Sequence, residues 1–289
     1  MFFVSMVLTI AAIICVSVYG LRLGADFKGG SVLELDFSTM RPDIGNVKMI
    51  IESTSSTAGI SLNPAGEKGL IIRMNEIDEP AHQKIVSAIK EKHPDAVEKR
   101  FDSIGPAIGR ELKNKSIQAI IVLLIAIVIY ISIVFRMMKR VLSPWAMGVA
   151  AIVALLHDLI IPIGVFALLG HYLDVEIGAV FLAAALTILG YSVSDTVVVF
   201  DRVRENVLRM GSKEPFGVLV HKSVMQTLSR SINTSMTTTL ALLAVYFFGG
   251  ESVKYFALAM IIGIVCGSYS SIFVASPILM WWHKKRKVI

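Results

Sequence analysis

The chain has 289 residues, of which 55% are hydrophobic and only 17% are charged, and its formal net charge is +6. An average soluble domain has about 25% charged residues, so this composition excludes an ordinary soluble protein and indicates several membrane-spanning helices. The basic residues lie in clusters between long apolar runs, where they set membrane orientation, so we expect no nucleic-acid partner.

Six segments approach the ~20 apolar residues that a helix needs to cross the hydrocarbon core. They are residues 2–21, 116–135, 146–169, 177–200, 233–248 and 255–282. The first segment resembles a signal peptide in its position, but it has no basic leading region and no clear small-residue cleavage site, so we expect a retained span. The fifth segment is short and rich in threonine, so its composition does not define where the span begins and ends.

The lysines and arginines of the short loops predict the orientation of these spans. The loops after the second and fourth spans and the C-terminal tail carry 13 basic residues, whereas the two opposite loops carry only Lys254. Cytoplasmic loops have an excess of Lys and Arg. We therefore expect both termini in the cytoplasm and residues 170–176 on the outside.

This orientation places residues 22–115 outside the membrane as one polar domain. Alternating or short apolar runs predict strands at SVLELDFS, KGLIIRMN and AVEKRFDSIG, and helical patterns occur at IGNVKMIIESTSSTAG and EPAHQKIVSAIKEKHP. The β-α-β-α-β order predicts a small ferredoxin-like α+β domain. The expected division is a first transmembrane helix at 1–21, this domain at 22–115, and a five-helix transmembrane bundle with cytoplasmic loops and tail at 116–289.

Two glycine-rich segments connect this domain to the spans. They are GADFKGGS and IGPAIGREL, which contribute Gly24, Gly29, Gly30, Gly105, Pro106 and Gly109. Glycine permits tight turns and close backbone approach, and the Gly-Pro pair ends a strand. A structural turn is favoured over a phosphate-binding loop, because no GK[ST] follows the first segment. We expect these residues to act as hinges or connectors.

Two carboxylates interrupt the apolar spans. Asp158 lies roughly at mid-bilayer in the third span, and Asp195 lies nearer the cytoplasmic side of the fourth. An ionised side chain in the bilayer costs at least ~2.5 kcal/mol on insertion scales, so we expect each carboxyl to have a functional or structural role that offsets this cost. For Asp158 a functional carboxyl and a neutral carboxyl bonded to a hydroxyl between helices remain alternatives. His157 points about 100° away on the helix, so the two need not touch.

The residues around Asp195 suggest helix contacts. Ser192 and Ser194 flank it, and Gly190 is expected to permit close helix approach. Arg230 begins the fifth span at comparable depth and can pair with Asp195 if the two spans touch; the alternative is one more positive-inside anchor. Hydroxyl residues follow Arg230 as a stripe, which we expect to face helices or water because a lipid-facing polar stripe is costly.

In the sixth span, small residues recur at three- and four-residue spacing and predict close helix packing rather than chemistry. They are Gly263, Gly267, Ser270, Ser271 and Ser276.

The chain has no HExxH, GxSxG or Walker sequence, so we expect no covalent chemistry, no metal and no cofactor. An intramembrane aspartyl dyad of Asp158 and Asp195 is the remaining enzymatic alternative. Cys15 and Cys266 both lie in apolar runs and are expected to be buried hydrophobic residues rather than a disulfide.

Five segments in this order resemble the SecF family of the resistance–nodulation–division superfamily: GADFKGGS, IGPAIGREL, LLHDLIIP, GYSVSDTVVVFDRVREN and TLSRSINTSMTTTL. The resemblance implies a six-span subunit of the bacterial inner membrane with one periplasmic domain. It implies a homologous partner, SecD, with which the subunit uses the proton-motive force to promote preprotein translocation through the SecYEG translocon, and it makes YajC a further candidate partner. It also implies functional roles for Asp195 and Arg230.

The residues and the resemblance suggest the same hypothesis. Asp195 binds and releases a proton as water reaches it from alternate sides, and Asp158 belongs to the same relay. The alternatives are a half-size proton-driven exporter of lipids or small molecules from the same superfamily, and a passive scaffold.

Overall fold

The computed structural model describes residues 2–55, 57–210 and 213–288, without the side chains of residues 140, 251–252 and 285–288. Four basic residues used in the orientation argument, Arg140, Lys285, Arg286 and Lys287, thus have side chains outside the described part. Contacts divide the chain into two compact units, Met1–Arg22 with Gln118–Ile289, and Leu23–Ile117. The expected boundaries at residues 22 and 115 lie close to this division.

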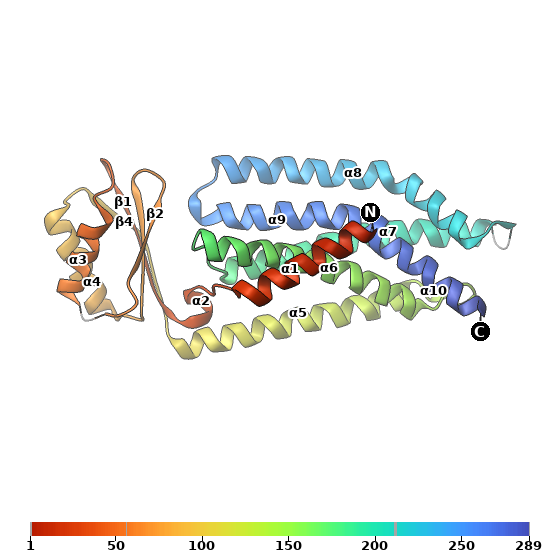
Figure 1. Ribbon diagram of the computed structural model, residues 1–289, viewed down its shortest axis with the longest axis horizontal. Helices are drawn as coiled ribbons and strands as arrows, with labels where there is room; N and C mark the ends of the chain where they lie inside the picture. Colours follow the sequence, from red (N-terminus) through yellow and green to blue (C-terminus); the bar gives the residue numbers. More distant parts are fainter. Residues whose placement is uncertain (1, 56, 211–212, 289) are drawn as a thin grey trace. The chain divides into compact units, whose positions relative to one another are not determined.

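The smaller unit is a four-stranded antiparallel sheet with two helices on one face (Figure 1). Its main elements are β1 Gly30–Phe37, α3 Ile44–Thr54, β2 Ser61–Ala65, β3 Gly69–Met74, α4 Glu79–Lys92 and β4 Ala96–Ile104, with the short helix α2 Ala25–Lys28 before them. The strand order β2-β3-β1-β4 gives the ferredoxin-like arrangement that the sequence predicted.

The element order in this unit differs from the prediction by one strand. The predicted order lacked β2, whose sequence SLNPA has no alternating pattern and contains Pro64. Proline is tolerated there because β2 is an edge strand. The predicted helix ending near Gly59 ends earlier, at Thr54, and Gly59 lies in the following loop with φ +76°.

Local sequence explains the two helices of this unit. Asp43 accepts a hydrogen bond from the Asn46 backbone N–H at the start of α3, and Asp78 accepts one from Ala81 at the start of α4. The alternating apolar residues of β1 and β3 are fully buried beneath the helices: Leu33, Leu35, Phe37, Leu70 and Ile72. This core holds the unit together.

The larger unit consists of long helices. They are α1 Phe2–Tyr19, α5 Pro106–Val134 (which begins in the smaller unit), η1 Arg136–Arg140, α6 Pro144–Tyr172, α7 Ala179–Met210, α8 Phe216–Phe248, α9 Glu251–Ser270, η3 Ser271–Ala275 and α10 Ser276–Val288. Six helical segments of the described chain are long and apolar enough to cross a membrane. The sixth combines α9, η3 and α10 as Val253–Lys284.

The helices α9 and α6 organise the packing of this unit. Helix α9 contacts α6, α7 and α8, and α1 lies along α6 (Figure 1). A Cβ added to Gly263 would lie 2.4 Å from Ile188 Cδ1, and one on Gly267 would lie 3.0 Å from Ser192 Cβ. The predicted packing role of these two glycines is confirmed. The expected close contact at Gly190 is wrong, because a Cβ there would meet nothing within 4 Å.

Candidate functional site

The Asp158 carboxyl on α6 is fully buried between three helices. Its Oδ2 accepts hydrogen bonds from the Ser192 hydroxyl of α7 at 2.5 Å and from the Ser270 hydroxyl of α9 at 2.7 Å. Its Oδ1 lies 2.8 Å from His157 Nδ1. These partners replace the hydrogen bonds to water that the carboxyl loses when it is buried.

His157 contacts Asp158 directly, which corrects the expectation that the two need not touch. The imidazole is buried, and its second nitrogen, Nε2, lies 3.0 Å from the Tyr269 hydroxyl of α9. Although adjacent helical residues diverge by about 100°, the ring turns back so that Nδ1 reaches the carboxyl. A continuous polar chain therefore runs from Tyr269 through His157 to Asp158. Tyr269 was not among the residues that we expected at the site.

The Asp195 carboxyl on α7 is half-buried and also joins three segments. Its Oδ1 accepts a short hydrogen bond from the Ser231 hydroxyl of α8. Its Oδ2 accepts one from the Ser271 hydroxyl, the first residue of η3, at 2.7 Å. Two uncharged donors on two different helices thus hold this carboxyl.

Ser270 and Ser271 do more than the sequence suggested. Both are fully buried, as expected for packing residues of the sixth span, and each also donates a hydrogen bond to one of the two intramembrane carboxyls. Small residues and hydroxyl donors share the same spacing in membrane helices, so sequence spacing does not distinguish them.

Arg230 lies beside Ser231 on α8, and its side chain is exposed. Within the described part of the chain, Arg230 and Asp195 form no ion pair in this conformation. The backbone carbonyl of Arg230 accepts a hydrogen bond from Thr234. The predicted pairing of Arg230 with Asp195 therefore stays a prediction for another conformation.

Helix α8 has two polar faces. The inner face is buried against the bundle and consists of Ser223, Thr227, Ser231 and Ser235. The outer face is exposed and consists of Arg230, Asn233, Thr234 and Thr237. The stripe that the sequence predicted is thus divided, and the outer part is exposed within a candidate membrane span.

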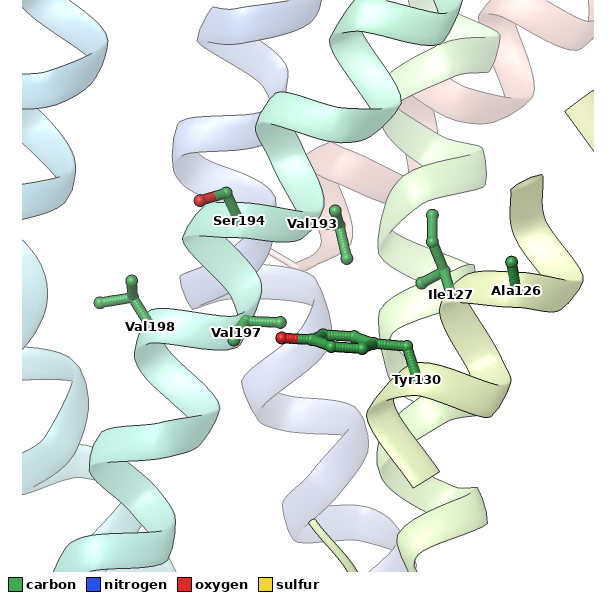
Figure 2. A pocket seen from close by; sticks show the side chains of 7 residues that line it. All are labelled: Ala126, Ile127, Tyr130, Val193, Ser194, Val197 and Val198. Carbon is green, nitrogen blue, oxygen red and sulfur yellow. The ribbon is translucent and has the colours of Figure 1, made fainter. Parts of the chain in front are cut away.

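A groove of about 440 Å³ lies on another side of α7, between that helix and α5 (Figure 2). Its lining is apolar apart from two hydroxyls: Ala126, Ile127, Tyr130, Val193, Ser194, Val197 and Val198. Of the two serines that flank Asp195 in sequence, Ser194 is one of the lining residues of this groove, with its hydroxyl directed away from α5 (Figure 2), and Ser192 bonds to Asp158. Neither donates to Asp195.

The connector glycines pack the two ends of the smaller unit against each other. A Cβ on Gly29 would lie 2.6 Å from Pro106 Cα, and one on Gly109 would lie 2.8 Å from the Gly29 nitrogen. A Cβ on Gly30 would lie 2.8 Å from the Met74 carbonyl oxygen. The two glycine-rich connectors therefore pass each other with their backbones in contact, where no side chain fits between them.

The remaining connector residues lie at the ends of elements. Gly24 precedes α2 as its N-cap, and Gly105 separates β4 from α5. A hinge role for this set of residues remains a prediction.

The geometry does not match an aspartyl dyad. Such a pair shares one proton between adjacent carboxyls, whereas Asp158 and Asp195 bond to different serines. The described residues include no cluster of three or more His, Cys, Asp or Glu side chains that could hold a metal ion.

Comparison with known proteins agrees with this architecture. Residues 84–285 match the family described as protein export membrane protein SecD/SecF, C-terminal, and residues 16–39 match the SecD/SecF GG motif, which includes Gly29 and Gly30. The protein translocase subunit SecF of Thermobaculum terrenum is 41% identical, over 98% of this chain and 92% of the relative.

The chain belongs to the SecF family.

Two further relatives and two solved structures support this placement. The SecF subunits of Anaerolinea thermophila and Synechocystis sp. are 36% and 37% identical, over 98% and 92% of this chain and 91% and 84% of their own lengths. The crystal structure of SecDF from Thermus thermophilus matches with a TM-score of 0.83 and 31% identity over 97% of this chain. SecDF in a super-membrane-facing form matches with a TM-score of 0.68, 31% identity and 99% coverage of this chain.

This chain spans 37% and 38% of the length of those two SecDF chains. As a SecF-family member it is a multi-pass membrane protein with a sheet-containing domain and an accessory subunit of the Sec translocon. The relatives are translocase subunits, so the comparisons do not favour the alternative of a half-size lipid or small-molecule exporter.

Proposed function

We propose that this chain works with SecD in the bacterial cytoplasmic membrane and uses the proton-motive force to promote preprotein translocation. The observation that carries the proposal is the setting of Asp195, a carboxyl within a membrane span that is held by hydroxyls from two other helices. Ionisable groups at such positions mark proton relays in membrane proteins. The subunit carries out no covalent chemistry of its own in this scheme.

Asp195 changes its charge as it binds and releases a proton. The ionised carboxyl accepts the hydrogen bonds from Ser231 and Ser271, whereas the protonated carboxyl needs less polar support. One elementary charge that crosses 100 mV provides about 2.3 kcal/mol, which is enough to bias a helix movement. Asp158 takes part as a second, fully buried carboxyl of the same relay.

Arg230 gives this cycle a second state. It is the residue next to Ser231, so a rotation of α8 by one residue step, about 100°, would bring its guanidinium toward Asp195 in place of the Ser231 hydroxyl. A cation beside the carboxyl favours its ionised form and therefore proton release, whereas a neutral hydroxyl favours the ionised form less. Rotation of α8 thus couples helix movement to the charge of Asp195.

The outer polar face of α8 supports SecD as the direct partner. Arg230, Asn233, Thr234 and Thr237 are exposed within a candidate span, and contact with lipid tails would be costly. A second membrane subunit that covers this face removes the cost. SecYEG, YajC and unfolded preproteins are the further partners that we propose for the assembled complex.

The proposed orientation places both termini in the cytoplasm and residues 22–115 in the periplasm. The asymmetry of Lys and Arg between the loops supports this orientation. In this arrangement the connector glycines transmit helix movement to the periplasmic domain, which handles the preprotein as it emerges.

Replacement of Asp195 by Asn tests the proposal, because the amide keeps the shape of the side chain but does not alternate between a neutral and a charged form. We expect normal assembly with SecD and loss of proton-dependent preprotein export in cells that depend on this subunit. Asp201→Asn is the matched control, since Asp201 lies on the same helix and forms an ion pair with Arg204 at 2.7 Å. Normal export by the Asp195→Asn variant would refute the proposed role.

A further inference from the structure

Two consecutive residues of the last span connect the two intramembrane carboxyls. Ser270 and Ser271 are both fully buried. The Ser270 hydroxyl donates to Asp158 Oδ2 on α6, and the Ser271 hydroxyl donates to Asp195 Oδ2 on α7, each at 2.7 Å. Consecutive helical side chains diverge by about 100°, which lets neighbouring residues face two different helices.

Each of these serines has a second acceptor on its own helix. Ser270 Oγ lies 3.2 Å from the Gly267 carbonyl oxygen, and Ser271 Oγ lies 3.5 Å from the Ser268 carbonyl oxygen. A hydroxyl has one proton to donate and two lone pairs that accept. When the carboxyl is ionised, the serine donates to it. When the carboxyl is protonated, the carboxyl donates to the serine oxygen and the serine proton turns to the backbone carbonyl.

The second serine begins a change in helix geometry. Residues Ser271–Ala275 form a π-helical turn, η3, between α9 and α10. The Ser276 hydroxyl donates to the Ser271 carbonyl oxygen at 2.9 Å, which closes this turn. Single π-helical turns within α-helices are rare and occur frequently at functional sites.

We propose that Ser270 and Ser271 are positioning residues that couple the protonation of Asp158 to the protonation of Asp195. The inference rests on the proposed role of the two carboxyls in proton transfer. A reversal of the hydrogen bond at one serine displaces the backbone at the start of η3, and this displacement changes the hydrogen bond of the adjacent serine. Such coupling is reciprocal, so each carboxyl affects the other.

The groups around the pair allow a specific test. His157 and Tyr269 contact the Asp158 end of the network, and Ser192 donates to the same oxygen as Ser270. At the Asp195 end, Ser231 is the other donor and the exposed Arg230 is its neighbour. These groups stay unchanged when only the two serines are replaced.

The experiment is infrared difference spectroscopy on the full chain, purified with SecD and placed in vesicles. The band of the protonated Asp195 carboxyl is identified by its loss in Asp195→Asn. In the parent protein, we expect Asp158→Asn to shift this band, because the serine pair transmits the change. In the background of Ser270→Ala with Ser271→Ala, Asp158→Asn should leave the band in place.

Ser268→Ala is the matched control, because its hydroxyl lies on the same helix and donates only to the Val265 carbonyl oxygen, at 2.8 Å. This variant should keep the shift. If the double variant fails to assemble with SecD, each single serine variant provides the same test, since either change interrupts the connection. In addition, Ser271→Ala should slow proton-driven export about tenfold, as expected for loss of a hydrogen bond to a charged group.

Three results would overturn the inference: an equal Asp195 shift with and without the two serines, no shift in the parent protein, or no titrating Asp195 band. Failure of the proposed function is a separate result, because it is seen as normal export by Asp195→Asn. The spectroscopic coupling requires no export. The two proposals can therefore fail independently.

Discussion

Asp158 and Asp195 are both carboxyls within apolar spans, but their surroundings differ. Asp158 has 0% exposure and three side-chain partners, whereas Asp195 is half-buried and has two hydroxyl donors. A group with some exposure exchanges protons with water more readily than one without. In the proposed relay, Asp195 is therefore the carboxyl that exchanges protons with water, and Asp158 is its fully buried second member.

Replacement of Asp158 should affect stability more than the usual surface change. Asp158→Ala leaves the Ser192 hydroxyl and His157 Nδ1 without their acceptor, whereas the Ser270 hydroxyl keeps the Gly267 carbonyl oxygen. Each buried polar group left unpaired costs about 1–3 kcal/mol, so we expect destabilisation by about 2 kcal/mol or more. Asp158→Asn keeps one acceptor oxygen and should cost less. Thermal unfolding of the purified protein measures the difference, and equal stability of the parent and both variants would contradict this reading.

Ser231→Ala removes one of the two donors to Asp195. We expect about tenfold slower proton-driven export, because a hydrogen bond to a charged group is lost. The matched control is Ser235→Ala, one turn along the same face of α8, where the hydroxyl lies 3.5 Å from that of Tyr191 and contacts no carboxyl. Export assays in vesicles measure both variants. Equal rates for the two would show that Ser231 has no special role.

Asp95 in the smaller unit provides a pH-dependent test outside the spans. The Thr39 hydroxyl, 2.7 Å from Asp95 Oδ2, lowers the pKa of this carboxyl below its ordinary value. Because this pKa is lower in the folded state than in the unfolded state, the carboxyl stabilises the folded state at pH values above its unfolded-state pKa. This stabilisation is lost as the pH falls through the folded-state pKa. Thr39→Val should raise the pKa of Asp95 toward its ordinary value. Carbon chemical shifts of Asp95 across an acid titration measure it, and an unchanged midpoint would contradict the assignment.

The sequence predicted the six spans but not the residues at which their helices begin and end. Helix α7 continues to Met210 and α8 begins at Phe216, well beyond the predicted ends at 200 and 233. Hydropathy reports only the part that lies in hydrocarbon, whereas hydrogen bonds along the helix continue into polar sequence. Strand β2 was missed for a related reason, because an edge strand that contains Pro64 lacks an apolar pattern.

The candidate site was predictable only in part. Asp158 and Asp195 were identified because a carboxyl within an apolar run is costly. Their donors Ser231, Ser270 and Ser271 were not identified, because their contacts depend on which helices become neighbours. The contact of His157 with Asp158 was missed because it depends on the orientation of the ring rather than on helical spacing.

The outer face of α8 should bind SecD. Asn233→Leu and Thr237→Leu replace exposed polar groups by apolar ones, so we expect less SecD to copurify with either variant. Ile232→Leu is the control, since Ile232 is 50% exposed on the same helix and the change conserves its apolar character. Quantitative copurification from detergent measures the three. Unchanged recovery of SecD with both Leu variants would place the partner elsewhere.

Two connectors join the sheet-containing unit to the membrane helices. Gly29→Ala should weaken their crossing, because the added Cβ would lie 2.6 Å from Pro106 Cα and the backbone has φ +82°. Gly66→Ala is the matched control, as it has φ +68° but nothing within 4 Å of the added Cβ. We expect lower export with Gly29→Ala than with Gly66→Ala, and faster proteolysis at the connector. Equal behaviour would show that the crossing is not required.

In the proposed cycle, protonation of Asp195 drives the movement of the helices. The most direct measurement is proton flux into vesicles that contain this chain with SecD, under an imposed proton gradient, for the parent, Asp195→Asn and Asp201→Asn. We expect proton flux in the parent and in Asp201→Asn, and only background flux in Asp195→Asn. Flux through Asp195→Asn equal to that of the parent would contradict the proposed cycle.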